Sequence, residues 1–433
     1  MSRTSAQIAE LSGSADNGKA QRYLQLMLLV LAAGSIYPVL YLRQVYQSTM
    51  LEVFAISNTE LGYLYSMLGT LFLVSYLPSG WLADRIPPRF LISFSLVATG
   101  LLALWYSTAP GFNSLLVIYA CWGISTGLTF WASVIKRVKM IAMHSEQGRF
   151  FGILDGGRGL VEALLATVAI ALFAYATETQ GQTVKTGFTH VVYLYAFTCL
   201  VIGALLLGVK DPKPSVSDDD LAENQKNNLL RDLKTLARIP ELWLVAAIVF
   251  CGYHIFWATY SFSAYLQEGG FGLSAVMAGT ITTIKLWMRP IGGIGGGYLG
   301  DKFSNISVLV VALVLATLGM IGLIVFPALH NLALLVFLVI FIGLLTYAIR
   351  GLYWAILDSC RIPLRITGLA IGIISVVGYS PDVFIPLING WIADAFPGFL
   401  GYQIYFGYIA FIGALGVLAA LTLQKMIRNK AGN

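Results

Sequence analysis

Apolar residues follow one another in long runs, and short polar segments separate these runs. Each run has about 20 residues, the length of helix that crosses the hydrocarbon core of a bilayer. Strands of a β-barrel would instead alternate apolar and polar residues over short segments, so the pattern excludes a barrel. We therefore predict twelve transmembrane helices over 24–46, 61–83, 90–108, 114–138, 150–176, 188–209, 241–267, 273–298, 306–327, 332–357, 366–392 and 402–423.

A polar segment divides the runs into two sets of six. Within it, apolar residues recur at helical spacing from Leu229 to Ile239, with basic residues between them. This pattern is typical of a short amphipathic helix on a membrane surface. We predict a tail, a six-helix bundle, a linker with this helix, a second six-helix bundle and a second tail, over 1–22, 23–209, 210–240, 241–424 and 425–433.

The composition agrees with a membrane protein. Of the 433 residues, 58% are hydrophobic and 11% are charged, whereas soluble domains carry about 25% charged residues. Soluble globular, disordered and disulfide-stapled proteins are therefore excluded. The 4 cysteines and 4 histidines are scattered along the chain, so we expect no disulfide framework, metal site or cofactor.

The net charge of +6 is explained by membrane topology and not by a nucleic-acid partner. Most of the 27 Lys and Arg residues lie in connections on one side of the predicted membrane, whereas the opposite loops contain only Lys185. Cytoplasmic loops carry the excess of basic residues. We expect a multi-pass protein of the plasma membrane with both termini in the cytoplasm.

The two halves of the chain carry corresponding motifs. Gly80–Arg85 after the second run matches Gly297–Lys302 after the eighth, and Arg149–Gly152 at the start of the fifth matches Arg365–Gly368 at the start of the eleventh. Both pairs are about half a chain apart. This spacing indicates a duplicated six-helix unit, which is the repeat architecture of many secondary transporters.

The stretch Gly80-Trp81-Leu82-Ala83-Asp84-Arg85-Ile86-Pro87-Pro88-Arg89 closely resembles the loop 2–3 signature of the major facilitator superfamily. The resemblance covers essentially the whole chain. It implies an all-α membrane protein with two six-helix bundles, related by pseudo-two-fold symmetry, that rock around a central site. It also implies a conformational-switch motif that braces inner helix ends in one transport state, comprising Gly80, Asp84, Arg85, Arg89, Asp301 and Lys302.

A narrower resemblance is to the organophosphate antiporter branch and to the YihN-type carriers associated with sulfosugar breakdown, which implies a bacterial inner membrane. The stretches that carry it are Gln147–Gly159, Gly378–Gly390 and Pro397–Tyr402. Arg158 aligns with a substrate-contacting histidine of the branch, and an arginine cannot carry a coupling proton because it stays charged. Ile255 occupies the place of the branch's second arginine in the seventh span.

Charged residues within the predicted spans are candidates for function, because each costs about 2.5–3.5 kcal/mol at a helix centre. The cations are Arg43, Arg158, Lys285, Arg289 and Arg350, and the acids are Asp155, Glu162, Asp358 and Asp382. Spans three, six, nine and twelve contain no Asp, Glu, Lys or Arg. By the resemblance, these four spans are peripheral and the other eight line the cavity.

Two of these cations lie on one helix face, because Lys285 and Arg289 are one turn apart. Either they hold an anionic substrate group, or Arg289 reaches toward the inner membrane surface, or both pair with acids on neighbouring helices. Arg43 lies near the outer end of the first predicted span, which favours snorkelling to the membrane surface. The branch resemblance instead implies a substrate-binding arginine partway along a longer helix.

The fifth span places Asp155, Arg158 and Glu162 on one face. The two acids either neutralise Arg158 permanently, or substrate displaces one of them, or one of them, Glu162 or Asp155, takes up a coupling proton. Arg350 lies toward the inner end of the tenth span, where Asp358 could pair with it.

Aromatic side chains accompany the remaining candidates and would hold a polyol or a ring. His254 in the seventh span, near Trp257, is either a packing residue or a proton site, and Asp382, after Tyr379, is either part of a gate pair or a proton carrier. For Lys136 at the inner end of the fourth span, the topological role is favoured over a substrate role.

Together these features predict a secondary active transporter of a small organic anion, such as a sugar phosphate, a sulfonated sugar or a carboxylate. Proton symport and antiport against an inorganic anion are both open. We expect a monomer in the lipid bilayer and no enzyme activity, because no nucleophile–base pair, metal cluster or nucleotide loop is present. A transporter-like membrane sensor is the alternative, since the organophosphate branch includes one.

Overall fold

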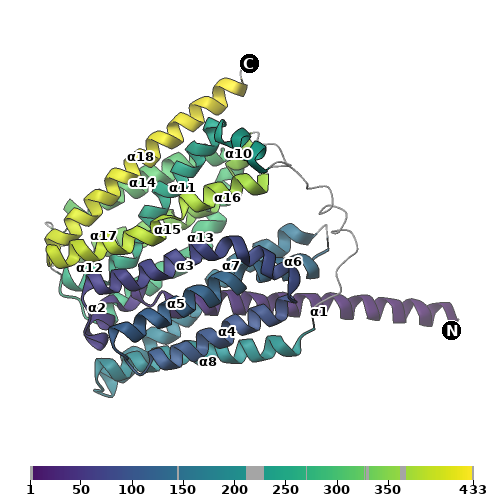
Figure 1. The fold of residues 1–433 in the computed structure, drawn as a ribbon, viewed down its shortest axis with the longest axis horizontal. Coiled ribbons are helices and arrows are strands. Elements are labelled where there is room, and N and C mark those ends of the chain that lie inside the picture. Colours follow the sequence, from purple (N-terminus) through teal and green to yellow (C-terminus); the bar gives the residue numbers. More distant parts are fainter. Residues whose placement is uncertain are drawn as a thin grey trace.

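The computed structural model describes residues 3–143, 146–210, 229–269, 271–325, 327, 331–360 and 367–431, and their regular structure is helical throughout (Figure 1). The first half contains α1 (Arg3–Leu40), α2 (Arg43–Phe54), α3 (Asn58–Arg85), α4 (Pro88–Tyr106), α5 (Phe112–Thr129), α6 (Trp131–Ile141), α7 (Gln147–Ala174), the π-helix η2 (Tyr175–Thr179) and α8 (Val184–Gly208). The second half contains α10 (Leu229–Ala237), α11 (Pro240–Ala258), η3 (Thr259–Ser261), α12 (Phe262–Glu268), α13 (Ala275–Lys302), α14 (Asn305–Val325), α15 (Leu332–Leu352), η5 (Leu357–Cys360), α16 (Thr367–Gly378), α17 (Pro381–Ala395) and α18 (Phe399–Ala431).

Each predicted span corresponds to a described helix or helix pair. Within the described residues, 10 helices are long and apolar enough to cross a membrane, and up to 11 if the bent pair Asn58–Ser75 and Pro78–Arg85 is one span. The remaining predicted span is α13, which is long enough with 28 residues. Lys285, Arg289 and a series of glycines lower its hydropathy, and this is the composition expected of a helix that faces polar partners.

Several spans are broken or longer than the sequence predicts. The first span runs over Ala20–Phe54 instead of 24–46, and it is interrupted at Tyr41 and Leu42 between α1 and α2. Similar breaks divide the fourth, seventh and eleventh spans, at Phe130, at Thr259–Ser261 and at Tyr379–Ser380. Helix α1 also includes residues of the predicted N-terminal tail, and the amphipathic linker helix is present as α10.

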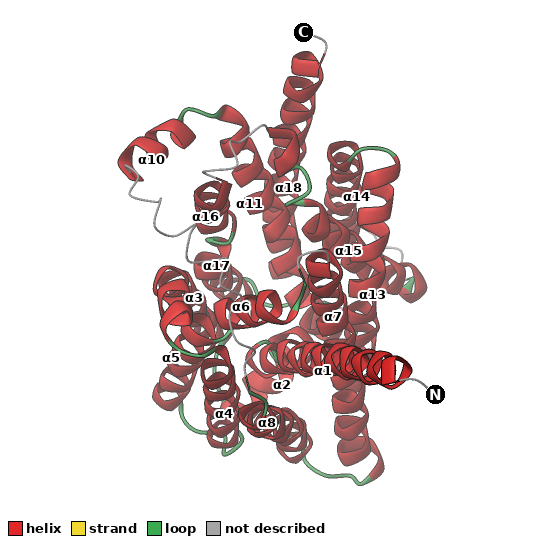
Figure 2. Cartoon of the chain, turned by 90° about the vertical axis from the view of Figure 1, so that its right-hand side faces the viewer, coloured by secondary structure: helices red, strands yellow, loops and turns green. Residues whose placement is uncertain are grey.

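The helices of the two halves pair in the same way. In the first half α3 packs on α5, α4 on α8 and α1 on α7, and in the second half α13 packs on α15, α14 on α18 and α11 on α16. Figure 2, which looks along many of the helices, shows the two groups beside each other. The main contacts between the halves are α3 with α17 and α7 with α13. Helices α4, α8, α14 and α18, which contain the four predicted spans without Asp, Glu, Lys or Arg, lie outside these contacts, as predicted.

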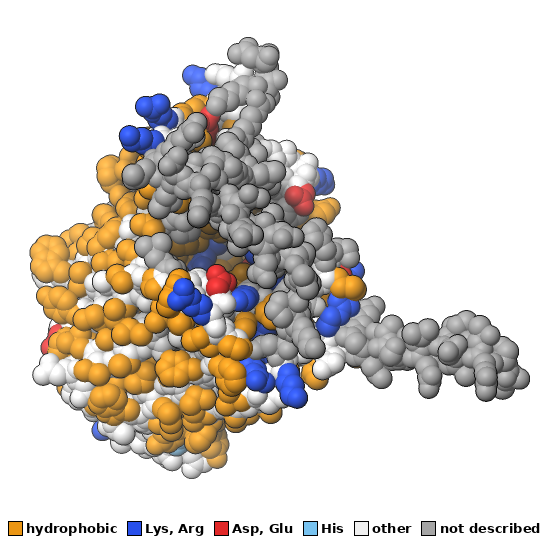
Figure 3. Space-filling model, turned by 45° about the vertical axis from the view of Figure 1, so that its right-hand side comes forward, with side chains coloured by type: hydrophobic (Ala, Val, Ile, Leu, Met, Phe, Trp, Pro, Cys, Tyr) orange, Lys and Arg blue, Asp and Glu red, His pale blue; other side chains and the backbone are white. Residues whose placement is uncertain are grey.

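The surface of the molecule suits a bilayer. Large apolar side chains are exposed on the peripheral helices, for example Phe94 on α4 and Phe411 on α18. Both termini and α10 lie at one end of the molecule, which we call the terminal end, and the α2–α3 and α17–α18 turns lie at the other, which we call the far end (Figure 1). Figure 3 shows a broad apolar flank with Lys and Arg side chains along its border toward the terminal end.

Glycines let the backbones of α3 and α17 touch. A Cβ atom on Gly62 would lie 2.5 Å from the carbonyl oxygen of Pro386, one on Gly69 would overlap the backbone of Asp382, and one on Gly390 would overlap the backbone of Asn58. Small residues permit such close helix packing in membranes. We call this contact the glycine seam, and it closes the far end between the two halves.

Replacing Gly69 with Val is expected to separate α3 from α17 and shift the protein toward a state that is open at the far end, because the branched side chain overlaps backbone that cannot rotate away. Distances between spin labels at Glu52 and Leu400, measured by pulsed electron paramagnetic resonance, would gain a longer population. The background would carry Cys121→Ser, since Cys121 is the exposed free cysteine among the described residues.

A matched control for this variant is Gly152→Val in α7, where a Cβ atom meets nothing within 4 Å. The two variants should differ in label distance and not merely in stability. Unchanged distances in Gly69→Val, in folded protein, would show that the glycine seam does not hold the far end closed.

Candidate functional site

The candidate side chains lie between the two halves, around the α7–α13 and α3–α17 contacts. Along α7, the Asp155 side chain is 75% exposed, whereas that of Arg158, one turn further from the terminal end, is 16% exposed. Deeper still, Lys285 is fully buried. This gradient indicates that water reaches the candidates from the terminal end.

The far end is closed by hydrogen bonds between the halves. The Asp394 carboxylate at the end of α17 accepts from the backbone N–H of Thr59 at 2.8 Å and from the backbone N–H of Asn58 at 3.1 Å, and so caps the first turn of α3 from across the interface. The Ser48 hydroxyl of α2 donates to Glu268 of α12 at 2.7 Å. The described state is therefore closed at the far end.

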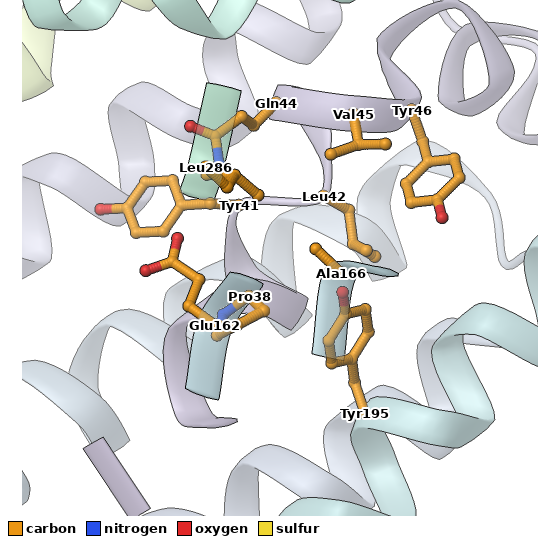
Figure 4. Close-up of a pocket in the computed structure, with 10 residues that line it drawn as sticks. All are labelled: Pro38, Tyr41, Leu42, Gln44, Val45, Tyr46, Glu162, Ala166, Tyr195 and Leu286. Carbon is orange, nitrogen blue, oxygen red and sulfur yellow. The ribbon is translucent and has the colours of Figure 1, made fainter. Parts of the chain in front are cut away.

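Arg289 on α13 forms an ion pair and hydrogen bond with Glu162 on α7. It thus follows the predicted alternative of pairing with an acid on a neighbouring helix, and it neither snorkels nor is left unpaired for a substrate. Glu162 also lines a small pocket with Tyr41 and Gln44, where its carboxylate points toward the Tyr41 ring (Figure 4). The pair joins the two halves near the middle of the molecule.

Lys285 is surrounded by neutral groups. Its ammonium donates to the side-chain oxygen of Gln44 at 3.1 Å and to the carbonyl and hydroxyl oxygens of Thr259, both at 3.3 Å. Both partners lie at helix breaks, since Gln44 follows the α1–α2 break and Thr259 begins η3. No carboxylate of a described residue lies within ion-pair distance of Lys285.

Arg158 is neutralised on its own helix. Its Nε atom lies 3.0 Å from Oδ1 of Asp155, and its guanidinium lies 4.8 Å from the ring centre of Trp131. Of the two acids predicted to face Arg158, Asp155 pairs with it, whereas Glu162 turns to Arg289. This is the predicted local charge pair, and an anion would have to displace Asp155 to bind here.

Arg43 is buried, and the snorkelling prediction is wrong. Its side chain is 3% exposed and donates to Gln47 at 3.1 Å and to Asn389 of α17. The prediction failed because the first span continues to Phe54, which places Arg43 well inside the helix pair. Its position partway along a long first span is the one that the branch resemblance implies.

Arg350 on α15 is half-buried and lies against aromatic rings. Its guanidinium is 4.1 Å from the ring centre of Phe256 and 5.7 Å from that of Tyr253. Tyr379 packs edge-on against Tyr253 at 4.9 Å. Among the described residues, no carboxylate lies within ion-pair distance of Arg350, and the side chain of its predicted partner Asp358 falls outside them.

Asp382 on α17 and His254 on α11 have different hydrogen-bond partners. Oδ1 of Asp382 accepts from the Tyr253 hydroxyl at 2.8 Å and from Nε1 of Trp257 at 2.6 Å. Nδ1 of His254 donates to the Phe250 carbonyl at 2.8 Å, so its Nε2 accepts from the Tyr408 hydroxyl at 3.1 Å. His254 is thus satisfied by neutral groups next to α18, which fits the packing interpretation.

The whole arrangement resembles known transporters. The family model described as the Major Facilitator Superfamily matches residues 23–386. The chain belongs to this superfamily. The inner membrane protein YqcE of Escherichia coli K12 is 30% identical over 390 residues, covering 88% of this chain and 90% of YqcE. The inner membrane protein YihN of the same strain is 27% identical over 410 residues, covering 93% of this chain and 95% of YihN.

More distant relatives within the superfamily include a named carrier. The D-galactonate transporter of Escherichia coli O6:H1 is 21% identical over 424 residues, and the match covers 89% of this chain and 92% of that transporter. Among solved structures, an inward-facing, unoccupied bacterial homologue of the human lysosomal transporter Spinster superposes with a TM-score of 0.74 at 16% identity, covering 94% of this chain and 98% of that one. The predicted fold is confirmed, and the chain is a transporter-type membrane protein and not an enzyme.

The superfamily signature lies at the terminal end, at the α3–α4 turn. The Lys136 ammonium of α6 donates to the Ala83 carbonyl at 2.8 Å and lies 3.6 Å from the Asp84 carboxylate, so it neutralises the C-terminal end of α3. This contact fits the topological prediction for Lys136. The guanidinium of Arg85 lies 4.0 Å from the Trp81 ring centre. Arg89 lies against the ring of Phe90. In the second copy of the motif, Lys302 follows Asp301 and lies against the ring of Phe303.

Proposed function

We propose that this superfamily member is a secondary active transporter of a small, sugar-derived organic anion that works by alternating access. The predicted class comprises sugar phosphates, sulfonated sugars and carboxylates, and the named D-galactonate relative favours a polyhydroxylated carboxylate. Coupling is to a proton or to a counter-anion. The proposed location is a bacterial inner membrane, with the terminal end in the cytoplasm and the protein as a monomer.

One observation carries the proposal: Arg350 presents a half-buried cation without a carboxylate partner among the described residues, on a wall of aromatic rings. A guanidinium binds a carboxylate through two parallel hydrogen bonds, and aromatic faces suit the apolar faces of a sugar chain. Lys285 and Arg43, which also bond to neutral groups, add positive potential deeper in the centre. Arg158 and Arg289 already have acidic partners, so they are the weaker candidates.

Counterflow in liposomes tests the proposal. Liposomes that contain the purified protein and are loaded with unlabelled D-galactonate should take up labelled D-galactonate. Sugar phosphates and sulfonated sugars should be tried in parallel. Neutral galactose should not compete. A ligand that raises the melting temperature without any exchange would contradict transport and favour the sensor, because binding alone stabilises the folded state. Competition by galactose equal to that of the anions would contradict the anion class.

A further inference from the structure

A buried carboxylate lies where the two halves meet. Asp382, in the first turn of α17, is 7% exposed, and both of its hydrogen bonds within the described structure come from neutral donors of α11. A carboxylate that is removed from water without a cation beside it is costly, and protonation removes the cost. The surroundings of Asp382 therefore suit a group that changes its charge.

The elements around Asp382 bring one cation toward it. From α11 come Tyr253 and Trp257, and from α15 comes Arg350, whose guanidinium lies 5.7 Å from the centre of the Tyr253 ring. Tyr379 precedes α17 and packs on the same ring, and Tyr260 follows Trp257 at a centroid distance of 4.9 Å. Helix α3 presents Gly69 to the Asp382 backbone, and its charged residues lie near its ends, at Glu60, Asp84 and Arg85.

The other predicted proton carriers are engaged differently. Glu162 has Arg289 as a direct partner, Asp155 has Arg158 and is mostly exposed, and both nitrogens of His254 are satisfied by neutral groups. Of these four candidates, Asp382 is the one that combines burial, the absence of a direct cationic partner and a place next to the proposed anion site.

We infer that Asp382 binds the coupling proton and that Arg350 and Asp382 together make the protein a symporter of one anion with one proton. The inference rests on the proposed function. Without substrate, the positive charge of Arg350 and the negative charge of Asp382 balance across Tyr253. A bound anion adds a negative charge in a region of low dielectric constant, and a proton taken from water restores the balance by forming an O–H bond on the carboxylate.

The hydrogen bonds indicate which oxygen takes the proton. Tyr253 and Trp257 both donate to Oδ1, so Oδ2 is available. A sodium ion would need several oxygen ligands instead, whereas this site offers donors, so a proton is the coupling ion that the chemistry fits. The proton returns to water from Oδ2 when the anion leaves.

Opening of the glycine seam would connect the Asp382 site to the far end of the molecule. Gly69 packs directly on the backbone of Asp382, so an opening of the far end that separates α3 from α17 uncovers this carboxylate from that side. In the described state, Arg350 and Tyr379 beside it are partly exposed. Proton and anion would therefore bind when the far end is open and leave through the terminal end.

Infrared difference spectroscopy tests the proton site without any substrate. Purified protein taken from neutral to acidic pH should gain the carbonyl stretch of a protonated carboxylic acid. Asp382→Asn should lose this band, Asp382→Glu should keep it at a shifted frequency, and Asp155→Asn, in a partly exposed ion pair, should keep it unchanged. A band of full intensity in folded Asp382→Asn protein would overturn the inference.

Transport assays separate this inference from the proposed function. In liposomes, an inward proton gradient should drive accumulation of D-galactonate by the wild-type protein. Accumulation by Asp382→Asn should be at least about tenfold lower than accumulation by the wild type. Counterflow exchange by this variant should be retained, because exchange needs no net proton movement. Gradient-driven accumulation by Asp382→Asn at the wild-type level would refute the symport. If the Asp382 band is present but D-galactonate is not moved, the proton site stands and the proposed substrate is wrong.

Discussion

Uptake of a sugar-acid anion is expected to fall about a hundredfold in kcat/KM when Arg350 is replaced by Gln. Loss of one partner of a desolvated charge pair costs about 2–5 kcal/mol, and each 1.4 kcal/mol is a factor of ten. Arg350→Lys keeps the charge but loses the planar pair of donors, so its kcat/KM should lie between those of the wild type and Arg350→Gln. Initial rates of uptake into proteoliposomes, measured over a range of concentrations, provide the check.

A matched control for this prediction is Arg428→Gln, because Arg428 is an exposed arginine near the end of α18 and far from the aromatic wall. Its uptake should equal that of the wild type. If Arg350→Gln transports as well as Arg428→Gln in folded protein, Arg350 is not the anion-binding cation, and the proposal loses its main support.

Breaking the pair between Glu162 and Arg289 is expected to have the second largest effect. Glu162→Gln leaves the Arg289 charge without its partner between the halves, which costs about 3 kcal/mol in the state closed at the far end. The expected results are a lower melting temperature and a longer population of label distances between Glu52 and Leu400. The double variant Glu162→Gln/Arg289→Gln should recover much of the stability, since no unpaired charge remains.

The ion pair between Arg22 and Glu146 is the matched control, because it has a length of 2.8 Å and joins two segments of the same half. Glu146→Gln should lower stability without changing the distance between the halves. Equal effects of Glu162→Gln and Glu146→Gln on the label distances would mean that the Glu162–Arg289 pair does not hold the halves together.

Hydropathy and helical spacing predicted much of this molecule. Runs of apolar residues identify the spans, because a bilayer demands continuous hydrophobic length. Helical periodicity also placed Asp155 beside Arg158 and set Lys285 and Arg289 on one face of α13. Such local relations depend on positions a few residues apart, and a single sequence is sufficient to reveal them.

Contacts between the halves were beyond a single sequence. Glu162 and Arg289 are 127 residues apart, and nothing local distinguishes Glu162 as a partner of Arg289 rather than of Arg158. The depth of Arg43 was misjudged for a different reason. Arg43, Gln44 and Gln47 are polar residues close to the end of the predicted apolar run, which by sequence alone places them near water. In the structure they are buried against one another and against the opposite half.

The breaks in the helices were also missed. Tyr41 and Leu42 carry no turn signal, and neither Gly nor Pro occupies Thr259–Ser261. In both places the sequence favours an unbroken helix, and tertiary packing around Lys285 overrides it. These breaks direct Gln44 and Thr259 toward the buried ammonium, so the least predictable part of the backbone is also the part nearest the candidate site.

The direct contact between α3 and α17 has a consequence for leakage. Because Gly62, Gly69 and Gly390 bring main-chain atoms together, no side chain separates the two backbones at these three positions of the glycine seam. Slippage of ions along this seam then requires whole helices to separate. The leak of ions through this contact in the resting protein should therefore be very small.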